Sequence, residues 1–120
     1  MDKHLTFEVL NEDEVIAIVS LHKPTGEVDV KNISHDFFDK NICRDIVDVE
    51  SLNDWFEFRC FLPTRADKDI LLREIGLKEY VPYHIVKITH GALFEDTHWI
   101  RFEGEVLKWA DVNPRRHNTV

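Results

Sequence analysis

Seven histidines are the side chains of this sequence best suited to metal or acid–base chemistry. Three of them, His84, His90 and His98, fall close together in the second half of the chain. Ligands that share one face of a helix are spaced three or four residues apart. His84 and His90 are six apart, and neither an HExxH nor a CxxC motif occurs. We therefore expect no metal and no cofactor, and whether the three histidines converge in space is left open.

Cys60 could act as a nucleophile only if the fold brought a histidine beside it. It lies between Arg59 and Phe61 near the end of an aromatic stretch, which is a typical environment for a small buried thiol. Carboxylate pairs are not a specific signal either, because 23 acidic residues make some pairs inevitable. The four glycines never approach a phosphate-binding loop pattern. The sequence thus offers no catalytic residue, and we expect a protein that is not an enzyme.

Two predicted helices on either side of Gly76 have the outline of a helix-turn-helix DNA-binding element. The second of them would present Tyr83, His84, Lys87 and His90. A single lysine gives little attraction for phosphates, and the linker over residues 77–81 is long for this motif. We therefore expect no direct binding of nucleic acid. These four side chains remain a second candidate surface for a protein partner.

Acidic residues are concentrated in the first half of the chain. Residues 1–60 hold 14 acids and 6 bases, whereas residues 61–120 hold 9 of each, so the net charge of −8 arises in the first half. Such a segment repels phosphates and attracts basic protein surfaces. The alternative is an acidic face that only keeps the protein in solution. We expect a partner-binding surface formed by seven acids, which are Asp36, Asp39, Asp45, Asp48, Glu50, Asp54 and Glu57.

The first third of the chain predicts an antiparallel meander of three strands. Residues 5–10 and 28–31 alternate in polarity, and residues 14–22 are rich in β-branched side chains. The Pro-Thr-Gly sequence at 24–26 supplies turn chemistry between the second and third strands. A fourth strand, over residues 99–103, must return to this meander from the far end of the chain.

Three helices are predicted between the third and the last strand. They are expected at residues 52–61 after a Ser51 N-cap, around residues 70–75 before Gly76, and from Pro82 to Gly91. A capped turn at Ser34 precedes them, with Phe37 and Phe38 as core anchors. The side chains expected to be largely buried are Trp55, Phe56, Ile70, Leu71 (or Leu72 in its place), Ile85, Val86, Trp99 and Trp109.

These elements predict a single α+β domain over residues 1–113, followed by a polar tail over residues 114–120. The antiparallel sheet would combine the N-terminal meander with the C-terminal strand, and about three helices would pack on one of its faces. The longest apolar run, residues 15–21, is the length of a strand, so no membrane association is expected. The acidic amino terminus is unlike a signal peptide, and this favours a cytoplasmic location.

The second half of the chain also carries a set of short motifs. They are Gly76-Leu77, Tyr80 with Pro82, Thr89-His90-Gly91, Trp99-Ile100-Arg101-Phe102, and Trp109 with Asp111-Val112. Through these motifs, residues 71–112 resemble small uncharacterised proteins of bacterial prophages and other mobile elements. The resemblance implies an accessory protein in conflicts between phages, plasmids and hosts. Anti-CRISPR proteins, many of which block nucleic-acid channels, are one class of that kind.

Segregated charge, the missing catalytic signature and this resemblance lead to one main hypothesis. The protein is expected to be an acidic, non-enzymatic interaction module that binds a basic protein surface, such as that of a nucleic-acid enzyme it inhibits. One alternative is a regulatory partner of a toxin or transcription complex that acts through the helical half. Another is a small enzyme without a recognisable motif. Charge reversal within residues 36–57 or within residues 83–90 separates the first two hypotheses.

Overall fold

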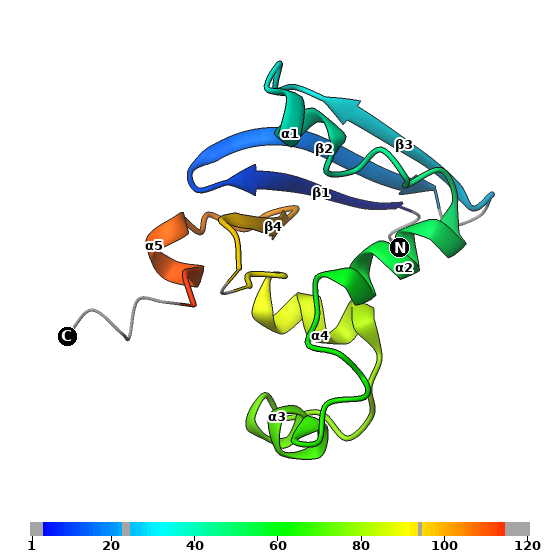
Figure 1. Cartoon of the computed structure of the whole chain (residues 1–120). Coiled ribbons are helices and arrows are strands. Elements are labelled where there is room, and N and C mark those ends of the chain that lie inside the picture. Colours follow the sequence, from blue (N-terminus) through cyan, green and yellow to red (C-terminus); the bar gives the residue numbers. More distant parts are fainter. Residues whose placement is uncertain (1–3, 23–24, 94, 115–120) are drawn as a thin grey trace.

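A four-stranded antiparallel sheet in the order β3-β2-β1-β4 forms the centre of the computed structural model (Figure 1). The structure describes residues 4–22, 25–93 and 95–114. The strands β1 (His4–Asn11), β2 (Glu14–His22) and β3 (Glu27–Asn32) form the meander, and β4 (His98–Phe102) pairs with β1. The predicted α+β class and the return of the last strand to the meander are therefore confirmed. Apart from Pro114, the predicted tail lies outside the described residues.

Five helices occur in the described part of the chain. They are α1 (Phe37–Asn41), α2 (Val49–Phe58), α3 (Lys68–Glu74), α4 (Pro82–Thr89) and α5 (Trp109–Val112). α2 packs on α4, and α3 lies at the end of the molecule farthest from β3 (Figure 1). Pro82 opens α4, as predicted, because its ring is already set for the first helical turn. None of these helices has the length and apolar character that crossing a membrane requires.

α2 begins and ends three residues earlier than the sequence predicts. Its N-cap is Asp48, not Ser51, and the Asp48 carboxylate accepts a hydrogen bond from the Ser51 backbone N–H at 2.8 Å. Ser51 Oγ accepts in return from the Asp48 backbone N–H at 3.0 Å, which completes a capping box. A carboxylate at this end also interacts favourably with the helix dipole. The shift keeps Leu52, Trp55 and Phe56 on the buried face.

The main core lies between one face of the sheet and the helices α2 and α4. Phe7 of β1 is packed against the rings of Trp55, Phe56 and Phe102, with centroids 5.5 to 6.0 Å apart. Of the predicted core, Trp55, Phe56, Ile85, Val86 and Trp99 are buried. The prediction is wrong for Ile70, which is exposed, and for Leu71 and Trp109, which are half-buried. Leu72 is the buried residue of α3, because this short helix meets the rest of the protein along one narrow side.

Phe37 and Phe38 are not core anchors, since they are 67% and 78% exposed. The residue that anchors α1 is Asp39, which is buried. Asp36, not Ser34, caps the helix by accepting from the backbone N–H groups of Phe38 and Asp39. This N-cap sets the rotation of α1 so that its third residue faces the protein and its two aromatic residues face water.

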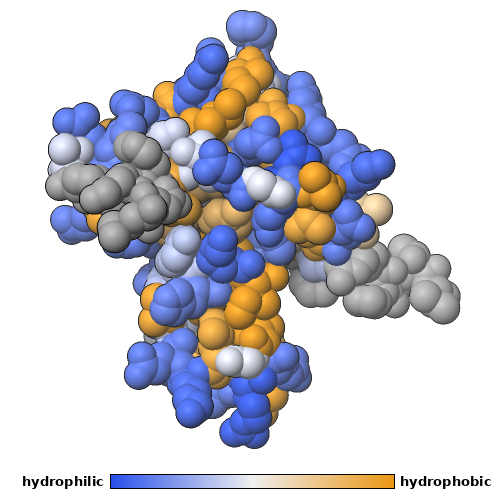
Figure 2. Space-filling model, turned by 180° about the vertical axis from the view of Figure 1, so that it is seen from behind, coloured by the Kyte–Doolittle hydropathy of each residue, from blue (hydrophilic) through white to orange (hydrophobic). Residues whose placement is uncertain are grey.

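The second face of the sheet is covered near β4. Leu10 and Trp99 are paired neighbours on β1 and β4, and both are fully buried. The indole N–H of Trp99 donates to the Glu12 carbonyl at 2.6 Å, and Arg101 donates to the Leu107 carbonyl at 3.1 Å. The segment that leads into α5 therefore lies against this edge. Seen from behind, the molecule shows several apolar patches, one of them along the side of the lower part of the view, whose far end is mostly hydrophilic (Figure 2).

Candidate partner-binding groove

Six of the seven acids predicted as a partner-binding surface are exposed, and Asp39 is not. Asp36 and Asp48 are N-caps whose carboxylates are engaged by backbone N–H groups of α1 and α2. Asp39 is buried, which corrects its assignment to a binding surface. The other four exposed acids are Asp45, Glu50, Asp54 and Glu57. Asp45 and Asp54 are the pair that the fold brings to one concave site.

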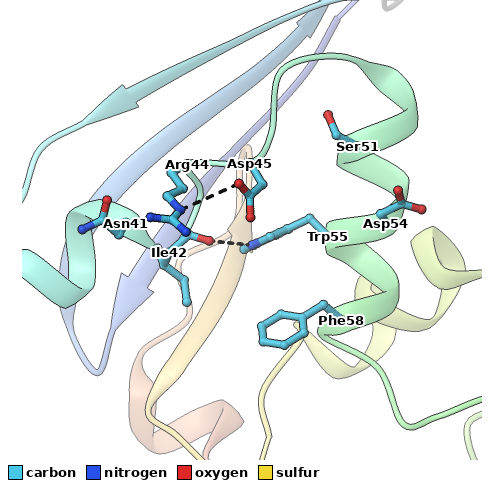
Figure 3. A pocket seen from close by; sticks show the side chains of 8 residues that line it. All are labelled: Asn41, Ile42, Arg44, Asp45, Ser51, Asp54, Trp55 and Phe58. Carbon is cyan, nitrogen blue, oxygen red and sulfur yellow. Dashed lines mark hydrogen bonds and ion pairs between the residues drawn. The ribbon is translucent and has the colours of Figure 1, made fainter.

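That concave site is a hollow of about 650 Å³ between α2 and the segment that follows α1 (Figure 3). Ile42, Trp55 and Phe58 give it apolar surface, while Arg44, Asp45 and Asp54 carry its charges, and Asn41 and Ser51 complete the lining. We call this set of eight residues the acidic groove. It combines aromatic surface with carboxylates, which is a typical composition for contact with a basic side chain.

The aromatic part of the acidic groove is held in place by the core. Trp55 Nε1 donates a hydrogen bond to the Ile42 carbonyl at 3.0 Å, so the indole spans the site from α2 to the opposite wall (Figure 3). The Trp55 ring is stacked on Phe7 with a centroid distance of 6.0 Å. Cys43 and Ile46, which flank the charged residues of that wall, are buried. The Trp55 part of the groove is thus preformed and needs little ordering when a ligand binds.

Arg44 is the one cationic side chain among the eight residues of the groove. Its Nε lies 3.8 Å from Asp45 Oδ1, and the two side chains are 70% and 93% exposed. Figure 3 shows the Arg44 side chain directed toward Asp45. An ion pair this long and this exposed contributes little to stability, because water screens the charges and the side chains lose freedom.

A buried polar network lies beside the groove and orients its elements. Arg59, only 1% exposed, donates to both Asp96 oxygens at 2.8 and 2.9 Å and to the carbonyls of Gly91 and His98. His98 Nε2 lies 3.0 Å from Asp39 Oδ1 and thereby ties α1 to β4. The sequence signal for this network was Arg59, which follows Trp55 and Phe56 at helical spacing on the apolar side of the predicted helix.

The two thiols are poorly suited to nucleophilic chemistry. Burial raises the pKa of Cys43 to about 12, and the nearby Arg59 charge only partly opposes this. Burial likewise raises the pKa of Cys60 to about 12, with Glu57 acting in the same direction. At neutral pH both groups are protonated, and the thiol is far less reactive than the thiolate.

The second candidate surface is largely engaged within the protein. Tyr83 is packed against Phe56 and Phe102, and Lys87 Nζ lies 4.2 Å above the Phe102 ring. His90 ends α4 in the left-handed conformation, and its Nε2 lies 2.9 Å from Glu105. The remaining residue of this surface, His84, is exposed. Over the described residues no three histidine, cysteine or acidic side chains come together as a metal site, so His84, His90 and His98 do not converge on one.

Comparison with known proteins adds no relative to this description. The chain matches no protein-family model, no curated protein and no solved structure. The functional argument therefore rests on the geometry and charge of the acidic groove.

Proposed function

We propose that this protein is a non-enzymatic interaction module whose acidic groove binds a basic segment of another protein. The observation that carries the proposal is the pairing of one exposed aromatic ring, that of Phe58, with two carboxylates, Asp45 and Asp54, in one hollow. A lysine or arginine side chain has an apolar stem and a cationic head. The stem would lie mainly on the exposed ring of Phe58, and the head would meet the carboxylates.

Long-range electrostatics support the same partner. Glu50 and Glu57 are exposed on α2 and extend the negative charge beyond the groove. Such a field raises the association rate of a basic partner and is weakened by salt. An inhibitor of a nucleic-acid enzyme fits this chemistry, because a channel for nucleic acid is lined with lysine and arginine. The mobile-element resemblance over residues 71–112 suggests the same setting.

The alternative of a regulator that acts through α4 has less support. Three of the four residues that it requires, Tyr83, Lys87 and His90, make contacts within the protein. A partner could reach His84 and Lys87, which are both exposed, but two side chains, one of which already lies over the Phe102 ring, give little basis for recognition. The acidic groove, in contrast, offers a shaped and charged surface.

Titration with a hexa-arginine peptide at low salt tests the proposal. The chain has three tryptophans, and the indole N–H signal of Trp55 in an NMR spectrum reports directly on the groove. We expect this signal to shift on binding, while that of Trp99, which is buried and bonded to Glu12, stays in place. Raising the salt concentration should reverse the shift.

A pair of variants shows whether the groove carboxylates are responsible. Asp45→Asn with Asp54→Asn should weaken peptide binding about tenfold at low salt. The matched control, Glu74→Gln with Glu79→Gln, removes the same charge from exposed positions outside the groove and should have a much smaller effect. Asp48 is left unchanged because it caps α2. A Trp55 signal that never responds to the peptide would refute the proposed function.

A further inference from the structure

Arg44 stands out because it is a cation inside an acidic site. It lines the same hollow as Asp45, Asp54 and Trp55. Its contact with Asp45 is long and both side chains are mostly in water, so little free energy holds the guanidinium there. The fold nonetheless places an arginine where the proposed function requires a basic side chain of the partner.

The chemistry of the acidic groove suits a guanidinium better than an ammonium. Phe58, which is 64% exposed, offers an aromatic ring on which the planar guanidinium can stack, and the largely buried Trp55 lines the same hollow. The Ile42 carbonyl accepts one hydrogen bond from Trp55, and a carbonyl oxygen has a second lone pair. Arginine has five N–H donors in a fixed fork for this oxygen and the carboxylates, whereas lysine has three donors on one atom.

We propose that the acidic groove takes an arginine side chain of the partner, and that Arg44 is its internal competitor. This inference rests on the proposed function and specifies both the ligand side chain and the residue that opposes it. An incoming arginine would displace Arg44 from Asp45. Until then the Arg44 charge repels other cations and lowers the affinity of the groove.

The first test compares two substitutions that remove the same charge. Arg44→Gln should tighten hexa-arginine binding at least threefold more than Lys40→Gln, with the Trp55 indole signal as the readout. Lys40 is exposed on α1, four residues before Arg44, and does not line the groove. Both positions are exposed, so both variants should keep the spectrum of the folded protein. Equal effects of the two substitutions would mean that only net charge matters and would overturn the role of Arg44.

The second test compares two peptides of equal charge on the unmodified protein. Hexa-arginine should bind at least fivefold more tightly than hexa-lysine, and the difference should persist in Arg44→Gln. Equal affinities would overturn the arginine assignment and leave the proposed function standing. Absence of a Trp55 response to both peptides, in the unmodified protein and in Arg44→Gln, would refute the proposed function itself. The two failures are therefore distinguishable.

Discussion

Arg59 binds Asp96 through both terminal guanidinium nitrogens, at 2.8 and 2.9 Å, and so joins two residues that are 37 positions apart. The arginine lies just beyond the end of α2, and the aspartate precedes β4. Arg59 Nε donates to the Gly91 carbonyl, and Nη2, which also binds Asp96, donates to the His98 carbonyl. This arrangement fixes the helix that carries one wall of the acidic groove against the sheet.

Replacement of Arg59 should strongly destabilise the fold. Arg59→Met leaves Asp96 without its cation and removes the Arg59 donors from two carbonyls, and breaking this partly buried pair should cost about 2 kcal/mol or more, since Asp96 remains 30% exposed to water. Urea denaturation measures the loss. The control is Arg65→Met, because Arg65 also makes two hydrogen bonds to an aspartate, Asp67, but at the surface. Similar losses in both variants would contradict a special role for the buried pair.

Stability should fall in acid through Asp96. Burial opposes its ionisation, but the hydrogen bonds and charge of Arg59 and the backbone N–H of His98 outweigh burial and lower the pKa of Asp96 below 3.8. The unfolded chain then binds a proton more readily than the folded one. The contribution is complete at neutral pH and is lost as pH falls from about 5 through the folded pKa.

Unfolding midpoints between pH 7 and pH 3 test this prediction. Asp96→Asn should be less stable than the unmodified protein at neutral pH. Its unfolding midpoint should also decrease less steeply as the pH falls below 5. Asp48 and Asp67 also have lowered pKa values, so part of the acid sensitivity will remain. If the unfolding midpoint of Asp96→Asn fell with pH as steeply as that of the unmodified protein, Asp96 would not contribute to the acid sensitivity.

Gly91 should tolerate alanine less well than Gly76. Both have positive φ angles, +63° and +81°, in which a side chain is strained by about 1 kcal/mol or more. A Cβ at Gly91 would also lie 3.1 Å from Ile100 Cδ1 and 3.2 Å from Arg59 Cβ, whereas the space around Gly76 is open to 4 Å. The melting temperature of Gly91→Ala should therefore be lower than that of Gly76→Ala. The reverse order would mean that packing around Arg59 is looser than described.

Cys43 and Cys60 should not react in the native protein. Their pKa values of about 12 and their burial leave almost no accessible thiolate at pH 8. A disulfide reagent such as DTNB should report close to two thiols in urea and a small fraction of that number under native conditions. Rapid reaction of one equivalent in the folded state would indicate a reactive cysteine and revive the enzyme hypothesis.

Local pattern was sufficient for most secondary structure. The richness in β-branched residues predicted the observed bounds of β2, Glu14–His22, and Pro82 marked the start of α4. These signals are carried by neighbouring residues, so they can be read without the fold. The helix cap at Asp48 was missed because Ser51 and Asp48 are both good caps, and their reciprocal hydrogen bonds decide between them only when the backbone is placed.

Part of the candidate site was also predicted from the sequence. The excess of acids in the first half of the chain predicted a site within residues 36–57, and the hollow is lined by two of the acids in that range, Asp45 and Asp54. The sequence did not separate these two from Asp39, whose burial depends on His98 and Asn11. Those partners lie 59 and 28 positions away, and no local pattern records such distances.

The sequence by itself determined the charge, the strand periodicity and the approximate helices, because each depends on residue type and near neighbours. Only the tertiary structure decided which aromatic residues face water. Phe37 and Phe38 look like core residues, yet the N-cap of α1 and the Asp39–His98 contact turn them outward. The acidic groove is likewise a product of the tertiary structure. Ile42 and Trp55 meet across it only because α2 packs on the sheet and directs an indole N–H toward a distant carbonyl.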